Sequence, residues 1–235
     1  MQAHSVVGRD QWLEARKALL AEEKAFIRER DRLAAARRAL PWERVEKAYA
    51  FETETGRKTL ADLFEGRSQL IVYHFMFGAD WEQGCPSCSF LAENFDGSAV
   101  HLSHRDVAFV AASRAPLDRL LAYRKRLGWR FPWVSSLGSD FNYDFHVSFT
   151  PEQMAAGTVD YNYREGQFPS EEAPGLSVFA RGDDGAIFHT YSTFARGLDP
   201  LISTYQYLDL VPKGRDEATL PWPMAWVRRN DQYDD

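Results

Sequence analysis

The chain has 235 residues, of which 45% are hydrophobic and 14% aromatic, which suits one large domain with appendages. Its 28 basic and 34 acidic residues give a net charge of −6, so the composition does not favour a nucleic-acid-binding protein. No stretch approaches 18 consecutive apolar residues, and the first ten residues lack the apolar region of a signal peptide. We therefore expect a cytoplasmic protein without a membrane partner.

The first predicted element is one long helix from Asp10 to about Ala39, a stretch without glycine or proline. Its large apolar residues recur every seven positions: Trp12, Leu19, Phe26 and Leu33. The positions midway between them are charged, so the apolar stripe is too narrow for an autonomous coiled coil. We expect residues 1–42 to form a helical extension that packs on its own domain or on a second subunit, which would make a homodimer.

The next elements alternate between strands and helices. The apolar, β-branched and aromatic run Leu70–Phe77 predicts a buried strand. The full order in this region is a strand at 45–53, a turn with a short helical segment at 56–66, a strand at 70–77, a helix at 86–95, a strand at 107–112 and a helix at 116–126. Strands that alternate with helices at this spacing indicate right-handed crossovers and parallel pairing.

The periodicity fails from Gly128 to Ala173, where many aromatic residues are mixed with Gly, Pro, Ser and Asn. A long irregular segment rich in aromatic residues indicates a functional insert rather than disorder. Regular patterns return as strands at 176–180 and 186–191, joined by a hairpin turn, and as a helix at 199–208. The remaining residues, 212–235, are rich in Pro and Trp, and we expect them to lie extended on the surface.

The only two cysteines form the motif Cys85-Pro-Ser-Cys88, between the predicted strand 70–77 and the helix that follows. Pro86 suits the first helical position, which places Cys85 near the N-cap. Backbone N–H groups and the positive end of the helix stabilise a thiolate there. Two cysteines three residues apart can also close a disulfide, so the motif predicts a redox-active dithiol. The alternative is a pair of buried structural cysteines.

The element order β-α-β-α-β-β-α, with the dithiol after the first strand, is that of the thioredoxin fold. We therefore predict an α/β, thioredoxin-like domain over residues 43–211, with a central mixed sheet flanked by helices and an insert at 128–173. The chain also resembles a family of bacterial proteins of unassigned function, domain-of-unknown-function 899, which is classed as thioredoxin-like. The stretches that carry the resemblance are Arg38–Trp42, Tyr73–Gly78, Gly84–Ser89, Phe131–Ser136, Gly138–Asp144 and His189–Ser192. The resemblance implies a fold and no particular substrate.

The thioredoxin analogy implies roles for three residues. Cys85 would be the attacking thiolate, Cys88 the resolving thiol, and Pro174 a cis-proline that faces the dithiol. The implied activity is thiol–disulfide oxidoreductase, which requires a disulfide- or thiol-containing substrate and an electron donor but no cofactor. The Pro-Ser dipeptide between the cysteines, and Trp81 four residues before Cys85 instead of adjacent to it, depart from thioredoxin and leave the partner open.

A thiol peroxidase is the nearest alternative, because the segment 60–64 before the buried strand is similar to peroxiredoxins. Those enzymes place Thr or Ser three residues before the reactive cysteine, whereas this chain has Glu82, whose carboxylate would repel a nearby thiolate. A second alternative is a binding protein without catalytic activity that keeps the fold.

Metal sites are weaker hypotheses. The spacing of Cys85, Cys88, His101 and His104 approaches that of a zinc finger, but the cysteines start a helix instead of lying in a hairpin. Residues 140–144 begin like a calcium loop but lack the required Gly and Glu. We therefore expect no metal. His74 is expected to be a hydrogen-bonded core histidine, and His189 is ambiguous between core and site.

The aromatic insert supplies the last prediction. It follows one core helix and returns at Pro174, so we expect residues 128–173 to fold over the edge of the Cys85 site and to form part of a pocket. Trp81, Tyr161 and Arg164 are the expected substrate-binding residues. The alternative is a small separate core without a role in binding.

Overall fold

The computed structural model describes residues 4–234. The chain divides into two compact units, one ending at Pro41 and the other starting at Trp42, and each is described by itself. The first contains α1 (Arg9–Arg38), a helix of 30 residues with Asp10 in its first turn and Arg37 and Arg38 in its last turn. These charges complement the helix dipole, and the predicted long helix is confirmed. A single helix cannot bury its own apolar stripe, which includes Trp12 and Phe26. That this stripe packs on its own domain or on a second subunit stays a prediction.

None of the helices in the described part of the chain combines the length and the apolar character needed to cross a membrane.

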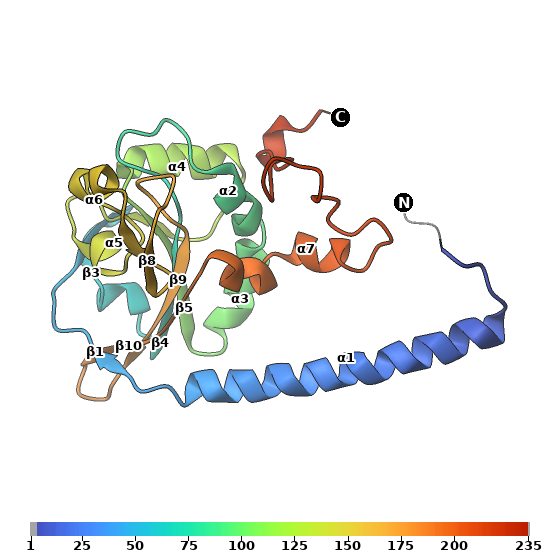
Figure 1. Ribbon diagram of the computed structural model, residues 1–235. Helices are drawn as coiled ribbons and strands as arrows, with labels where there is room; N and C mark the ends of the chain where they lie inside the picture. The colour runs from blue at the N-terminus through green and yellow to red at the C-terminus, as the bar shows by residue number, and fades with distance from the viewer. Residues whose placement is uncertain (1–3, 235) are drawn as a thin grey trace. The chain divides into compact units, whose positions relative to one another are not determined.

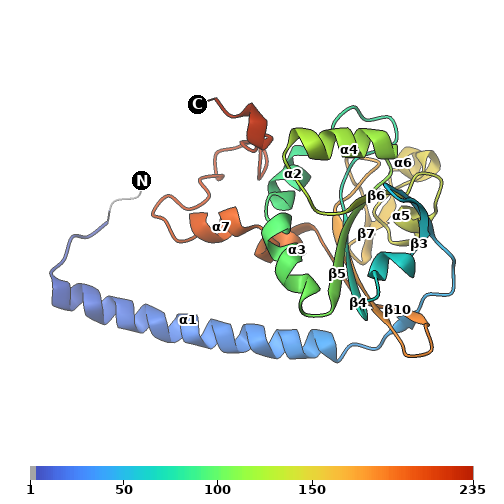
Figure 2. The ribbon, with the colours of Figure 1, turned by 180° about the vertical axis from the view of Figure 1, so that it is seen from behind.

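The second unit is built on an eight-stranded mixed sheet, visible from two sides in Figures 1 and 2. The strand order is β1-β10-β9-β4-β5-β6-β2-β3. The strands are β1 (Glu43–Arg44), β2 (Ala50–Thr53), β3 (Gly56–Thr59), β4 (Gln69–His74), β5 (Val107–Ser113), β6 (Trp133–Ser135), β9 (Gly175–Arg181) and β10 (Ile187–Phe194). A separate hairpin consists of β7 (Val159–Tyr161) and β8 (Arg164–Gly166).

The pairing around β4 defines the fold. β4 runs parallel to β5 on one side and antiparallel to β9 on the other, and β9 pairs antiparallel with β10. This is the arrangement of the thioredoxin fold, in which the strand before the active-site helix lies between a parallel and an antiparallel neighbour. The predicted fold class is therefore confirmed, and the strands at 70–77, 107–112, 176–180 and 186–191 are all present with small shifts of their ends.

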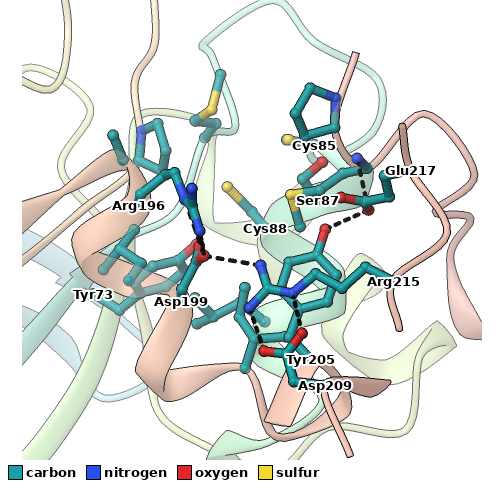
Figure 3. A pocket seen from close by; sticks show the side chains of 18 residues that line it. Tyr73, Cys85, Ser87, Cys88, Arg196, Asp199, Tyr205, Asp209, Arg215 and Glu217 are labelled. Carbon is teal, nitrogen blue, oxygen red and sulfur yellow. Dashed lines mark hydrogen bonds and ion pairs between the residues drawn. The ribbon is translucent and has the colours of Figure 1, made fainter. Parts of the chain in front are cut away.

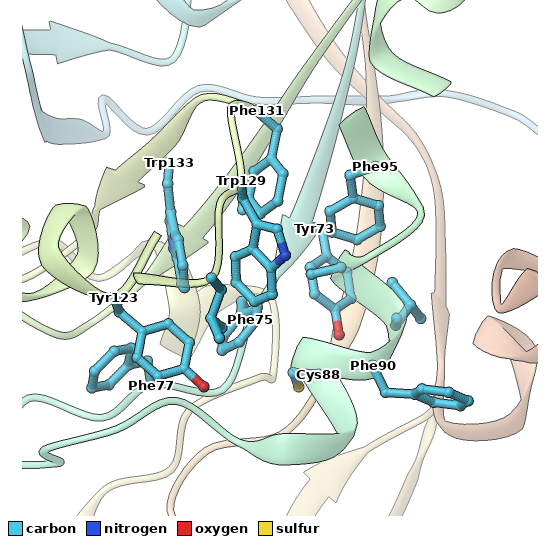
Figure 4. Packing of buried hydrophobic residues seen from close by; sticks show 14 of the residues in the cluster. Tyr73, Phe75, Phe77, Cys88, Phe90, Phe95, Tyr123, Trp129, Phe131 and Trp133 are labelled. Atoms are coloured by element: carbon cyan, nitrogen blue, oxygen red, sulfur yellow. The ribbon is translucent and has the colours of Figure 1, made fainter. Parts of the chain in front are cut away.

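Side chains of β4 and the loop after it alternate between the two faces of the sheet. Tyr73, Phe75 and Phe77 enter one core, whereas Leu70 and Val72 enter another. The first core contains α2 (Pro86–Ala92), α3 (Phe95–Ser103) and α4 (Leu117–Arg126) and is rich in aromatic rings, as Figure 4 shows. Cys88 is part of this core, so α2 is held by burial of its inner face.

Several predicted boundaries are wrong. The strand expected at 45–53 is confined to β2. The helix expected at 86–95 ends at Ala92, and α3, which was not predicted, follows it. The helix expected at 199–208 is a 3-10 segment, η2 (Ala195–Leu201), followed by α7 (Ser203–Leu208). Pro200 explains the last break, because proline disrupts a regular helix. Other short helices are η1 (Asp62–Phe64), α5 (Phe141–Asp144), α6 (Pro151–Ala156) and η3 (Asn230–Gln232).

The segment 128–173 is less separate than the word insert suggests. Its β6 pairs with β5 and belongs to the main sheet, and Trp129, Phe131 and Trp133 lie in the main core. A smaller core contains Phe149, Val159 and Ala173, against which Tyr161 and Phe168 pack. The aromatic residues of this segment therefore divide among the main core, the core on the other face of the sheet, which takes Phe141 and Phe145, and the satellite core.

The chain after residue 211 is not an extended surface tail. Val227 is buried, and Met224 and Trp226 pack against the main core. The Glu217 carboxylate fixes this segment because one of its oxygens accepts hydrogen bonds from the Tyr205 hydroxyl, the Met224 N–H and the Trp226 indole N–H at 2.7–3.0 Å. A partly buried acceptor with three donors holds the surrounding backbone in place, which composition alone did not reveal.

Candidate functional site

Cys85 is the N-cap of α2, and Pro86 occupies the first helical position, as the motif predicts. The Cys85 N–H donates to the Met76 carbonyl at 3.0 Å, which fastens the start of the helix to the chain just beyond β4. Gly84 is required for this approach: a Cβ there would lie 2.6 Å from the Phe75 ring. Local backbone contacts therefore place Cys85 at the carboxyl end of the central strand.

Both thiols are free, and they differ in burial: Cys85 is half-buried, whereas Cys88 is buried. The Cys85 pKa is lowered from its ordinary value of 9.0 to about 7. The main cause is a hydrogen bond from the Cys88 thiol, followed by the backbone N–H groups of Cys88 and Ser87 and the positive charge of Arg229, while burial acts in the opposite direction. A substantial fraction of Cys85 is therefore thiolate at neutral pH.

Cys88 lies deeper, and burial raises its pKa well above the ordinary value. The neighbouring Cys85 sulfur raises the pKa of Cys88 further, whereas the Tyr73 hydroxyl and the Met76 N–H contact the Cys88 sulfur and lower it. The outer sulfur of the pair is thus the one that ionises, and the inner sulfur keeps its proton. This is the asymmetry that an attacking and a resolving thiol require.

The dithiol forms part of a pocket of about 630 Å³, shown in Figure 3. Its apolar lining comes from Tyr73, Met76, Leu91, Pro174, Ala195, Leu198, Ile202, Tyr205, Pro223 and Met224. Its polar lining comes from Cys85, Ser87, Cys88, Arg196, Asp199, Asp209, Arg215 and Glu217. A concave, mainly apolar cavity with a few polar groups is the usual form of a small-molecule site.

Arg215 organises the wall of this pocket that the C-terminal segment supplies. Its guanidinium binds both oxygens of Asp209 at 2.8 Å and Asp199 at 3.0 Å, and it lies 3.9 Å from the centroid of the Tyr205 ring. Arg196 also binds Asp199, at 3.1 Å. The bidentate contact makes this an oriented network rather than a loose surface ion pair.

Arg229 ties the C-terminal segment directly to the start of α2. It donates to the Gly84 carbonyl and to the Tyr123 hydroxyl, both at 2.7 Å. The Tyr123 hydroxyl lies 2.9 Å from the hydroxyl of Ser89, which in turn donates to the Cys85 carbonyl at 2.9 Å. The segment predicted to be a surface tail therefore supports the dithiol and supplies one wall of its pocket.

The predicted cis bond before Pro174 is wrong, since no peptide bond in residues 4–234 is cis. Pro174 nevertheless lines the pocket together with Cys85 and Cys88. Its carbonyl accepts a hydrogen bond from the Tyr161 hydroxyl at 2.8 Å, and the trans form is the intrinsically preferred state of an X–Pro bond.

The expected substrate-binding residues lie behind or away from the pocket. Tyr161 also accepts from the Ala195 N–H at 3.1 Å, so it holds two lining residues, Pro174 and Ala195, from behind. Trp81 donates to Glu171 at 2.9 Å, and Arg164 is exposed on β8. The lining includes no residue of 128–173, so the prediction that the aromatic segment forms part of this pocket is wrong. The residues of 195–224 occupy that place.

The zinc-like spacing does not form a cluster. His101 lies in α3 and His104 at its end, both exposed, whereas the cysteines lie at the start of α2. Among residues 4–234 there is no group of three or more His, Cys, Asp or Glu side chains placed to hold a metal ion. In the calcium-like stretch, Lys47 bridges Asp140 and Asp144 at 2.8 and 2.7 Å.

His74 and His189 are joined by a chain of side-chain hydrogen bonds, buried at His74 and partly exposed at His189. His74 Nε2 lies 2.8 Å from the Ser177 hydroxyl, which lies 2.8 Å from the Ser192 hydroxyl, which lies 2.7 Å from His189 Nε2. Burial and, to a smaller extent, the charge of His189 lower the pKa of His74 to about 3. His74 is therefore a neutral core histidine at physiological pH, as expected.

The sequence did not predict most of the pocket, notably Tyr73, Tyr205, Arg215 and Glu217, or Arg229, which supports the start of α2. Tyr73 lies in the predicted strand and reads as an ordinary core residue. Tyr205 lies in the last predicted helix and the others follow it. No periodic pattern in this part of the sequence indicates that these residues line or support a pocket. The only available signal was the number of apolar residues after position 211, which is high for a solvated tail.

Comparison with known proteins gives one family match. The sequence model of a family described as "Bacterial protein of unknown function (DUF899)" matches residues 1–233. No curated protein sequence matches the chain significantly.

Similar solved structures include three bacterial proteins. Peroxidoxin BcpB from Mycobacterium tuberculosis is 12% identical, with 72% of this chain and 97% of that chain covered and a TM-score of 0.45. A mutant of PrxQ from Xylella fastidiosa is 10% identical, with 71% of this chain and 94% of that chain covered and a TM-score of 0.43. A mutant of peroxiredoxin Q from Xanthomonas campestris is 12% identical, with 72% of this chain and 98% of that chain covered and a TM-score of 0.44. These likenesses are too distant to carry an argument about activity.

Proposed function

The chain belongs to this family of bacterial proteins of unknown function, and we propose that it acts as a thiol–disulfide oxidoreductase through Cys85 and Cys88. The observation that carries the proposal is that the two thiols at the N-terminus of α2 differ in burial and in pKa. Cys85 is half-buried with a pKa lowered to about 7, and Cys88, which donates to it, is buried with a raised pKa. One thiol is poised to attack and the other to resolve.

The reaction follows from these two states. The Cys85 thiolate attacks one sulfur of a substrate disulfide, which forms a mixed disulfide and releases one substrate thiolate. The Cys88 sulfur then attacks Cys85, its proton passes to the second departing thiolate, and the Cys85–Cys88 disulfide remains. The substrate gains two electrons, and a dithiol electron donor must reduce the protein again.

The Tyr73 hydroxyl and the Met76 N–H have a defined part in the second step. Both contact the Cys88 sulfur and lower its pKa against the effect of burial. As Cys88 loses its proton, these donors stabilise the negative charge that develops on the sulfur. Tyr73 is therefore a positioning residue for resolution rather than for the first attack.

Turnover of a disulfide substrate with dithiothreitol as the electron donor tests the proposal. Wild type should catalyse the exchange, Cys85→Ser should abolish it, and Cys88→Ser should accumulate a mixed disulfide on Cys85. Ser98→Ala is the matched control, because Ser98 is an exposed serine of α3 that does not line the pocket, and this variant should retain activity. Equal turnover by wild type and Cys85→Ser would refute the proposal.

A thiol peroxidase is the second candidate, favoured by the position of Cys85 in a concave, mainly apolar pocket of a size that suits a small substrate. In that reaction the Cys85 thiolate reduces a hydroperoxide to an alcohol and becomes a sulfenic acid, which Cys88 condenses to the same disulfide with loss of water. Rates with a hydroperoxide and with a disulfide, measured on the same protein, distinguish the two activities. A protein that turns over neither would be a binding protein with a retained dithiol.

A further inference from the structure

We propose that the substrate of this dithiol is a small disulfide with an uncharged, largely apolar body, and that the protein discriminates against anionic and protein disulfides. The proposal rests on the proposed function and goes beyond it, since the dithiol alone does not select a substrate. The substrate would be selected by residues 195–229, which line one side of the pocket next to Cys85 and bind the start of α2.

The cavity has the volume and the lining for a small molecule. It measures about 630 Å³, within the range of roughly 300–1,000 Å³ that is usual for ligand pockets. One side of the cavity is apolar because Leu198 and Ile202 line it. Pro223 and Met224 of the segment after residue 211 add to this side, and Leu91 lines the cavity from α2. A disulfide whose sulfur reaches Cys85 would therefore bury the rest of its body against apolar side chains, which favours apolar substituents.

The charged residues of the pocket are already paired with one another. Arg215 makes three hydrogen bonds to Asp209 and Asp199, and Arg196 is also bound to Asp199. The lining holds two arginines and three carboxylates, a formal charge of −1. An anionic disulfide would therefore compete with these carboxylates for the two guanidinium groups and would meet net negative charge, so the pocket disfavours it.

The wall is fixed next to the reactive sulfur. Glu217 holds Tyr205, Met224 and Trp226 through one oxygen, and Arg229 binds the carbonyl of Gly84, the residue directly before Cys85. Figure 3 shows Glu217 and Arg215 among the side chains that line the cavity together with the two cysteines. A protein disulfide would have to bring its own backbone against this fixed segment to reach Cys85, whereas the volume of the cavity accommodates a small disulfide.

The test uses the full chain in its reduced form and single-turnover kinetics with three disulfides. They are dithiodipyridine (neutral and aromatic), oxidised glutathione (anionic) and insulin (a protein). Each rate is divided by the rate of dithiothreitol with the same disulfide, which removes differences in intrinsic reactivity. The ratio should be highest for dithiodipyridine, followed by oxidised glutathione and then insulin.

Met224→Trp fills part of the pocket, and Leu210→Trp places the same side chain on an exposed position of the same segment that does not line it. For each variant, the rate with dithiodipyridine is divided by the rate at which iodoacetamide alkylates Cys85. This ratio should be lower than in the wild type by about fivefold or more in Met224→Trp and unchanged in Leu210→Trp. If Met224→Trp prevents folding, Ile202→Ala, which enlarges the cavity, replaces it and should alter the preference among the three disulfides.

The outcomes separate the two proposals. If no disulfide is reduced and Cys85 and Cys88 do not form a disulfide, the oxidoreductase function fails and the substrate inference falls with it. If disulfides are reduced but the normalised rate is highest for oxidised glutathione or insulin, the function stands and the substrate inference is wrong. An equal effect of Met224→Trp and Leu210→Trp on the dithiodipyridine rate would also overturn the inference.

Discussion

Replacing Cys88 by alanine should raise the pKa of Cys85, because the hydrogen bond from the Cys88 thiol is the largest cause of its lowered value. Serine at position 88 is the matched variant. It removes the resolving sulfur but keeps a hydroxyl that donates to Cys85. Both variants lack the second sulfur, so the difference between their Cys85 pKa values measures the effect of the hydrogen bond alone.

The size of the effect follows from the pKa of about 7 against the ordinary value of 9.0. At neutral pH a thiol of pKa 7 is about half ionised, whereas one of pKa 9 is roughly one part in a hundred thiolate. Loss of the largest stabilising contact should raise the pKa by about one unit or more, since hydrogen bonds to the charged form shift a pKa on this scale. The N–H groups of Ser87 and residue 88 remain, so the shift should stop short of the full two units.

The assay is a titration of thiolate absorbance against pH, combined with the pH dependence of alkylation by iodoacetamide. Wild type should titrate near pH 7, Cys88→Ala at least about one unit higher, and Cys88→Ser between them. Alkylation of Cys88 in the wild type should be much slower than that of Cys85, because its sulfur is buried. A wild-type midpoint at or above the ordinary value, or identical midpoints for the alanine and serine variants, would refute this account of the site.

Three further predictions concern stability and assembly. Arg114→Met should destabilise the protein by about 3–5 kcal/mol, because it leaves Glu172 buried without the partner it binds at 2.9 Å, and the double variant Arg114→Met/Glu172→Leu should recover much of this loss in urea unfolding. The pKa of His74 in the folded state is about 3, below its ordinary value of 6.5, so the unfolded chain takes up the proton first. Stability should therefore fall as the pH drops from about 6.5 towards 3, by up to roughly 1.4 kcal/mol per pH unit from this residue. The slope should be smaller in His74→Gln, and an unchanged slope would contradict the assignment. Deleting residues 1–40 should lower solubility or change the mass in solution, since the apolar stripe of α1 needs a covering surface; a truncated protein with unchanged melting temperature and mass would show that it does not.

The central part of the fold could be predicted because local patterns and tertiary packing agree there. Residues 70–73 and 107–112 form continuous runs of aliphatic, aromatic and small side chains, as buried parallel strands require, and they pair directly in the structure. Pro86 marks the first helical position of α2, so the location of Cys85 followed from local backbone rules alone. The positions of the two cysteines in the fold could therefore be predicted from the sequence.

The walls of the pocket could not be predicted, because long-range polar contacts create them. Glu217 gathers donors from α7 and from the segment around Trp226, and Arg229 reaches Gly84, 145 positions earlier in the chain. Neither residue belongs to a periodic pattern, and a charged residue near a chain end usually lies in solvent. Conversely, the aromatic stretch 128–173 suggested a lid because aromatic residues need burial, but three of its rings satisfy that need in the main core.

The most direct test of the central claim is the redox state of the two cysteines after mild oxidation, measured by mass spectrometry of the intact chain and of its peptides. The account predicts loss of two hydrogens, a peptide in which Cys85 is linked to Cys88, protection of both from alkylation, and full reversal by dithiothreitol. Two thiols that stay free and alkylate as before, or a disulfide that forms only between chains, would contradict it.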